Sequence, residues 1–276
     1  MKGSLGWIVV LGLLAPPACQ KKAAPPVAPA PAAARAAERA DAHAGWVFKS
    51  DDEALAIAAR FLSAQPVILE AGSYHGETAL AMARRWPRST IYSFEPVPEL
   101  FAIVKRNTEA FKNIHPSELA LGDKVGTAVF HLSTMAGKPD ASLGSGSLLE
   151  PSHHLEGFPW VKFDNAITVS TTTIEAWAKD HHVEKIDFIW LDVQGAEFTV
   201  LKAAGAILKT VRVIMAEVEF VELYKGQSLY AEMKPWLEAR GFAQVATDFD
   251  ATAPKMADLK NRKGTSWYGN AIFVKK

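Results

Sequence analysis

Cysteine is almost absent from this chain of 276 residues, in which Cys19 is the only one. A single cysteine excludes an internal disulfide and any zinc site built from several cysteines. An excess of charge is missing as well, because 30 Lys and Arg side chains balance 30 Asp and Glu side chains. Without a basic excess to neutralise a phosphate backbone, nucleic acid is not expected as a partner.

A long apolar run is also missing. The stretch Leu5–Leu14 is shorter than the roughly 20 apolar residues that span a bilayer. Lys2 before it and small residues after it describe a secretory signal, and Cys19 stands where a bacterial lipoprotein is cleaved and acylated, although Pro16 departs from the usual pattern. We expect residues 1–19 to be a lipoprotein-like signal and the protein to be attached to a bacterial membrane through a lipid on Cys19. Another kind of signal, or an accidental apolar start in a cytoplasmic protein, are the alternatives.

Residues 20–44 consist mostly of Ala and Pro and show no apolar periodicity. Such a segment buries too little surface to offset the entropy of ordering it, so it is interpreted as a linker. Residues 45–276 are predicted to form the folded domain.

Short apolar runs alternate with helical patterns through that domain, which predicts an α/β fold with a doubly wound, mostly parallel sheet and helices on both faces. Seven strands are predicted for this sheet: Val67–Ala71, Thr90–Phe94, Glu118–Leu121, Ile186–Leu191, Val211–Ala216, Phe242–Ala246 and Ala271–Val274. Six helices are predicted, one before the first strand and five between strands: Asp51–Ala64, Gly76–Arg85, Glu99–Phe111, Thr173–His181, Phe198–Leu208 and Ser228–Arg240. Two further extended stretches, Ala128–Leu132 and Thr168–Thr171, flank a predicted loop at Ala141–Gly157.

A glycine turn follows the first predicted strand. It includes Glu70, Gly72, Ser73 and Gly76, and its two glycines allow a backbone to approach a ligand closely. A dinucleotide site would need G-x-G-x-x-G, whereas the spacing here is acid-x-G-x-x-x-G, as in enzymes that bind S-adenosylmethionine. Glu95 ends the next strand, about 20 residues further on, where an acid can accept hydrogen bonds from ribose hydroxyls.

These residues, taken in order, resemble the FkbM family of methyltransferases. The resemblance runs from about Val67 to Glu217 and is carried by four pieces: Glu70-Ala-Gly72 with Gly76, Phe94-Glu95-Pro96, Ala120-Leu121-Gly122, and Asp192-Val-Gln-Gly-Ala-Glu197. Many relatives have Glu where this chain has Gln194, so Gln194 is left out of the catalytic candidates.

The resemblance implies a Rossmann-like methyltransferase with S-adenosylmethionine as its cofactor. It implies that Glu70, Gly72, Ser73 and Gly76 frame the methionine part and that Glu95 holds the ribose. Ala120 and Leu121 would lie near the adenine, and Asp192 would face the point of methyl transfer. As acceptor it implies the hydroxyl of a sugar or secondary metabolite, that is, a small molecule or a glycan.

A hydroxyl acceptor needs a base. The candidates, in order, are Asp192, His75 and Glu219, although His75 is equally typical of a turn without chemistry. Ser142–Ser147 could cover the acceptor or be a solvated insertion. The pairs His153-His154 and His181-His182 lack the spacing of ligands on one face, so no metal site is predicted.

Two other functions stay open at this point. A membrane-tethered binding or scaffold lipoprotein would keep the fold and lack catalysis, although the acids Glu70, Glu95 and Asp192 are all present. A nucleotide-sugar or dinucleotide oxidoreductase would use a similar sheet, but its G-x-G-x-x-G pattern is missing.

Overall fold

The computed structural model describes residues 45–142, 144–249 and 267–276. The predicted signal at 1–19, the linker at 20–44 and Cys19 lie outside the described residues. Within the described ranges, no helix combines the length and the apolar character needed to cross a membrane.

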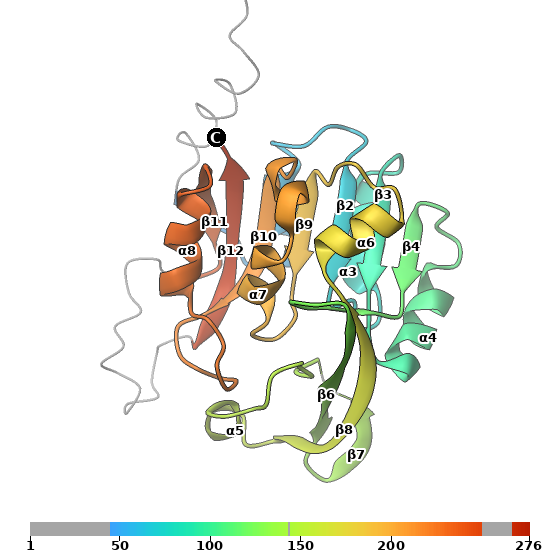
Figure 1. Cartoon of the computed structure of the whole chain (residues 1–276), viewed down its shortest axis with the longest axis vertical. Coiled ribbons are helices and arrows are strands. Elements are labelled where there is room, and N and C mark those ends of the chain that lie inside the picture. The colour runs from blue at the N-terminus through green and yellow to red at the C-terminus, as the bar shows by residue number, and fades with distance from the viewer. Residues whose placement is uncertain (1–44, 143, 250–266) are drawn as a thin grey trace, which may run out of the picture. The chain divides into compact units, whose positions relative to one another are not determined.

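The centre of the fold is an eight-stranded sheet with the order β1-β11-β12-β10-β9-β2-β3-β4 (Figure 1). Its strands are β1 (Trp46–Val47), β2 (Val67–Ala71), β3 (Thr90–Phe94), β4 (Ile114–Ser117), β9 (Phe188–Leu191), β10 (Val213–Glu219), β11 (Phe242–Thr247) and β12 (Tyr268–Lys275). Strand β12 runs antiparallel to β10 and β11, and the other pairs are parallel. The predicted doubly wound, mostly parallel sheet is confirmed, with two-residue β1 added as an eighth, edge strand.

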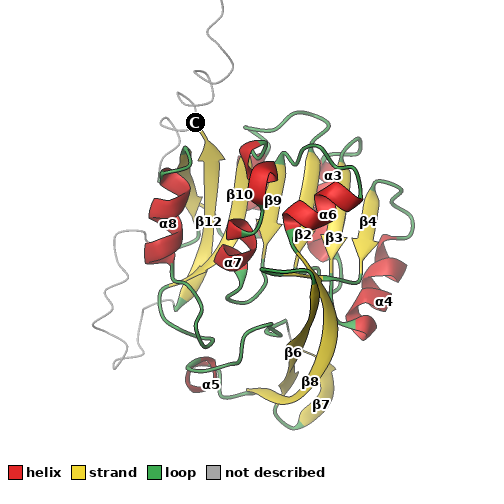
Figure 2. Ribbon diagram, in the orientation of Figure 1, coloured by secondary structure: helices red, strands yellow, loops and turns green. Residues whose placement is uncertain are grey.

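Two apolar cores cover the two faces of this sheet. On one face pack α6 (Ile174–Asp180), α7 (Glu197–Lys202) and α8 (Tyr230–Glu238), with Trp177, Phe198 and Leu237 among their buried side chains. On the other face pack α2 (Asp51–Ala58) and α3 (Glu77–Arg85), through Leu55 and Met82. Figure 2 shows α6 and α7 in front of the sheet and α3 behind it.

A second, four-stranded sheet has the order β5-β8-β6-β7. Its strands are β5 (Ala120–Leu121), β6 (Gly126–Met135), β7 (Lys138–Ser142) and β8 (Val161–Thr172). The remaining elements are α4 (Pro98–Thr108), α5 (His154–Gly157) and the 3₁₀ helix η1 (Gly205–Lys209). Strands β6 and β8 extend away from the central sheet at the edge where its parallel strands end (Figure 1).

The predicted third strand, Glu118–Leu121, is wrong. The third strand of the central sheet is β4, and Ala120–Leu121 forms β5 of the second sheet. Because β4 is an edge strand that contains His115 and Pro116, it lacks the apolar run that marks a buried strand.

Two helices are also shorter than predicted. The helix expected to reach Ala64 ends at Ala58, and the one expected at Phe198–Leu208 is divided into α7 and η1. A turn at residues 203–204 separates these two, and η1 begins at Gly205, whose φ of +56° lies in the left-handed region. The stretch predicted at Thr168–Thr171 is the end of the long strand β8.

Candidate functional site

The glycine turn is packed tightly against the end of β9. Gly72 has a φ of +89°, and a Cβ at this position would lie 1.8 Å from the backbone oxygen of Asp192. The Asp192 amide donates to the Ala71 oxygen at 3.0 Å, which joins the ends of β2 and β9. Only glycine fits this contact, so Gly72 allows the turn to lie directly against the backbone of Asp192. In parallel sheets, ligands bind beyond strand ends of this kind, where the strand order changes direction.

Glu95 is held in place by the backbone of the turn. Its Oε2 accepts from the Tyr74 amide at 2.9 Å, and its Oε1 accepts from the Val97 amide at 3.0 Å. Burial raises the pKa of the Glu95 carboxyl to about 7, although these two hydrogen bonds lower it. Each oxygen retains a second lone pair, with which it can accept a hydrogen bond from a ligand hydroxyl.

Glu70 lies beneath the turn and does not contact the pocket. Its side chain is 1% exposed, and its Oε2 accepts from Ser73 Oγ at 2.5 Å and from Ser93 Oγ at 2.7 Å. Burial raises the pKa of Glu70 to about 7. The predicted acid of the turn therefore supports the turn from below, together with Ser73.

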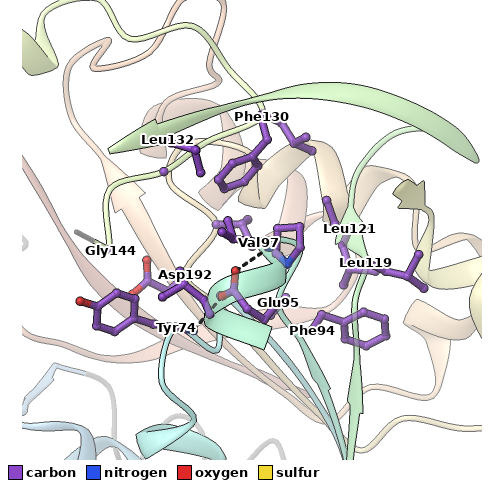
Figure 3. A pocket seen from close by; sticks show the side chains of 18 of the residues that line it. Tyr74, Phe94, Glu95, Val97, Leu119, Leu121, Phe130, Leu132, Gly144 and Asp192 are labelled. Carbon is purple, nitrogen blue, oxygen red and sulfur yellow. Dashed lines mark hydrogen bonds between the residues drawn. The ribbon is translucent and has the colours of Figure 1, made fainter. Parts of the chain in front are cut away.

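A pocket opens beside the turn, between the ends of β2, β3 and β9 and the second sheet (Figure 3). Its empty volume is about 840 Å³, counting the part that is open to solvent. Its lining is largely apolar and comes from Ala71, Gly72, Tyr74, Phe94, Glu95, Pro96, Val97, Leu100, Leu119, Ala120, Leu121, Phe130, Leu132, Ser133, Gly144, Gly146, Leu148, Asp192 and Val193.

Five of the residues predicted from the sequence line this pocket: Gly72, Glu95, Ala120, Leu121 and Asp192. They come from four segments that are far apart in the sequence. The expectation that Ala120 and Leu121 belong to the ligand site is thus compatible with their position, although their strand belongs to the second sheet.

The other predicted residues lie outside the pocket lining: Glu70, Ser73, His75, Gly76 and Glu219. The ring of His75 stacks on Tyr74, and its Nδ1 lies 3.6 Å from Glu77 Oε1. Glu219 is 2% exposed at the end of β10. Gly76 precedes α3 with a φ of +86° and packs against Thr108 of α4. His75 and Glu219 do not line the pocket, so neither is placed to act as the base there.

Asp192 belongs to a group of acids at the ends of β9 and β10. Carboxylate oxygens of Asp192, Glu197 and Glu217 all lie within 4.8 Å of one another. Burial raises the pKa of Glu197 and Glu217, and repulsion within the group adds to the effect. The pKa of Asp192 is raised as well, because surrounding protein atoms limit its hydration, although its side chain remains exposed. Asp192 is the member of this group that lines the pocket. A carboxylate with a raised pKa is a better proton acceptor, so Asp192 is the candidate base that the geometry favours.

Several lining residues were not predicted as site residues. Figure 3 shows Phe130 and Leu132 of β6 on the side of the pocket away from Glu95 and Asp192. The two side chains alternate with His131 along the strand, a pattern that indicated a strand but not what its inner face covers. Gly144 and Gly146, from the stretch Ser142–Ser147, also line the pocket, as does Leu148 after it.

The lining fits the parts of S-adenosylmethionine. Glu95 offers acceptor oxygens for ribose hydroxyls, and Leu119, Leu121 and Phe130 offer apolar surface for a flat ring. The bare backbone at Gly72 allows close approach next to the negative charge of Asp192. A positively charged sulfonium would be attracted by that charge.

Comparisons with known proteins identify the family. A model of the methyltransferase FkbM domain matches residues 70–243, more than half of the chain. The 2-O-methyltransferase NoeI of Sinorhizobium fredii is 35% identical over 162 residues, which cover 59% of this chain and 67% of NoeI. Methyltransferase 1 of Beauveria bassiana is 26% identical over 200 residues, 70% of this chain and 77% of that protein.

Among solved structures, the methyltransferase FkbM from Methylobacillus flagellatus is similar with a TM-score of 0.47 and 10% identity. The likeness covers 77% of this chain and 44% of that one. The relatives are methyltransferases, and neither a scaffold lipoprotein nor an oxidoreductase finds support among them. The chain belongs to the FkbM family and is an S-adenosylmethionine-dependent methyltransferase.

Proposed function

We propose that this methyltransferase acts on oxygen, and that its acceptor is a hydroxyl of a sugar or secondary metabolite. The observation that carries the proposal is that Glu95 and Asp192 line one pocket, at the ends of β3 and β9. The name of the relative NoeI, a 2-O-methyltransferase, supports transfer to oxygen.

The cofactor supplies a methyl group already activated on a sulfonium. The protein therefore has to bind the cofactor and the acceptor, orient them, and remove a proton from the acceptor hydroxyl. Glu95 would accept hydrogen bonds from the ribose, and the apolar residues Leu121 and Phe130, which line the same pocket, would hold the adenine. Asp192 would accept the proton of the acceptor hydroxyl while the hydroxyl oxygen takes the methyl group from the bound cofactor. Most of the acceleration comes from holding these atoms in line.

The proposal is tested with cofactor that carries a deuterated methyl group. The protein is incubated with methyl glycosides, oligosaccharides with free hydroxyls and hydroxylated secondary metabolites, and products are analysed by mass spectrometry. Label on a hydroxyl oxygen is expected. Label on nitrogen or carbon, or no label from this panel in a protein that binds the cofactor, would contradict the proposed acceptor class.

We also propose that the protein works at a bacterial membrane, to which a lipid on Cys19 attaches it. The support is the position of the lone cysteine shortly after the apolar run Leu5–Leu14, with Ala15-Pro-Pro-Ala18 between them. Residues 20–44 would then separate the domain from the membrane surface.

A further inference from the structure

Gln194 occupies the centre of the acidic group. It follows β9 in a strained backbone conformation with a φ of +54°. Its Nε2 donates to Asp192 Oδ1 and to Glu217 Oε2, both at 2.8 Å. Non-glycine residues hold such a conformation where the surroundings determine it, often at functional sites. Here one amide satisfies two carboxylates at once.

The other polar atoms of Gln194 contact the segment that borders the pocket. Its backbone oxygen accepts from Ser147 Oγ at 2.7 Å. Its Oε1 lies 3.0 Å from the hydroxyl of Tyr224, which also lies 2.9 Å from the Ser145 oxygen. Ser145 and Ser147 flank Gly146, which lines the pocket. Gln194 therefore connects the candidate base to the segment opposite it.

The amide of Gln194 donates hydrogen bonds into a group of acidic side chains around Asp192. Several described acids and tyrosines have charges that act on Asp192 or are affected by it: Asp51, Glu70, Glu197, Glu217, Glu219, Tyr224 and Tyr268. Limited hydration raises the pKa of Asp192, and the hydrogen bond from Gln194 lowers it. A carboxylate at position 194 would add a further negative charge between two existing ones.

We propose that Gln194 is a positioning residue of the transfer reaction: it holds the Asp192 carboxylate toward the pocket and fixes the segment Gly144–Leu148 against it. The inference rests on the proposed function for the role of Asp192 as base. It does not depend on which hydroxyl is methylated. The amide donates a hydrogen bond that lowers the pKa of Asp192, whereas an ionised acid at this position would raise it.

The test needs no acceptor. The full chain is titrated by calorimetry with S-adenosylmethionine, whose sulfonium is positively charged, and with S-adenosylhomocysteine, whose sulfur is neutral, between about pH 5 and about pH 8.5. Ionised Asp192 favours the charged ligand, so the ratio of the two affinities should fall as the pH decreases through the pKa of Asp192. Variants Gln194→Met and Gln194→Glu are compared with Gln65→Met, which changes an exposed glutamine outside the pocket.

In Gln194→Met, the midpoint of this fall should move up by about one pH unit, because a hydrogen bond to a charged group is lost. In Gln194→Glu it should move further. If Gln194→Met fails to fold, Tyr224→Phe serves as a second variant, with a smaller shift in the same direction.

A ratio that does not change with pH in the wild type, or a midpoint that stays at the Gln65→Met value, would overturn the proposal. A purely structural role would weaken both ligands equally and leave the midpoint in place. Because acceptors are not used, failure of the glycan assay leaves this result unaffected.

Discussion

Replacing Glu95 by Ala should weaken cofactor binding without unfolding the domain. Glu95 is 4% exposed at the end of β3, and each of its carboxylate oxygens already accepts one backbone hydrogen bond. The ribose hydroxyls would use the remaining lone pairs. Hydrogen bonds to a charged group contribute about 1.5–3 kcal/mol, so the dissociation constant should increase by roughly 10- to 150-fold.

The pKa of Glu95 adds a signature that distinguishes ribose binding from a general loosening of the turn. Burial raises this pKa to about 7 in the protein without ligand. Because the ribose donates to the ionised form, binding should be tightest above that value and weaken by up to about tenfold for each pH unit below it. In Glu95→Ala this dependence should disappear.

Calorimetry with S-adenosylhomocysteine at several pH values measures both effects, and circular dichroism checks the fold. Glu99→Ala is the matched control, since Glu99 is exposed on α4, four residues away and outside the pocket. Unchanged affinity in folded Glu95→Ala would show that Glu95 does not hold the ribose. A weaker affinity that keeps the wild-type pH dependence would assign the loss to the turn instead.

Three further predictions concern stability and location. Glu70→Gln should raise the melting temperature most above pH 7, because the raised pKa of about 7 means that ionised Glu70 destabilises the fold there. In thermal unfolding, this gain should shrink as the pH is lowered from 7 toward 4.5, the ordinary pKa of Glu. An equal gain at all pH values would contradict this cause. Gly72→Ala should lower the free energy of unfolding by more than the roughly 1–3 kcal/mol that a strained backbone costs, because the added Cβ would meet Asp192. Gly137→Ala is the control, since Gly137 has a φ of +79° but open space around it. Equal losses for the two variants in chemical denaturation would refute the clash. Cys19→Ser should release the protein from the bacterial membrane fraction, and unchanged fractionation would exclude the lipid anchor.

The sequence predicts those parts of the fold whose signal is local. The buried run at Phe188–Leu191 and the glycine turn at Gly72–Gly76 are recognisable because burial on both faces and a close backbone approach restrict the residue types. Edge strand β4 is not recognisable, because an edge position accepts His115 and Pro116.

The site was predictable where a motif places a residue at a strand end, as for Glu95 and Asp192. It was not predictable where side chains meet only in three dimensions. The side-chain contact between Gln194 and Tyr224 joins residues 30 positions apart, and no periodicity relates them. Glu70 illustrates the opposite error, because the motif gives its place in the chain, whereas the hydroxyls of Ser73 and Ser93 hold it below the pocket.

The central claim is that Asp192 removes the proton from an acceptor hydroxyl in the pocket that binds S-adenosylmethionine. The direct measurement is single-turnover methyl transfer to the best acceptor of the panel by wild type and Asp192→Asn, with cofactor affinity measured on the same samples. Asn retains the size of Asp but lacks the negative charge, so the rate should fall by about 10²–10⁴ while affinity changes little. Full turnover in Asp192→Asn would contradict the account, and a loss of affinity with an unchanged rate would make Asp192 a cofactor-binding residue instead.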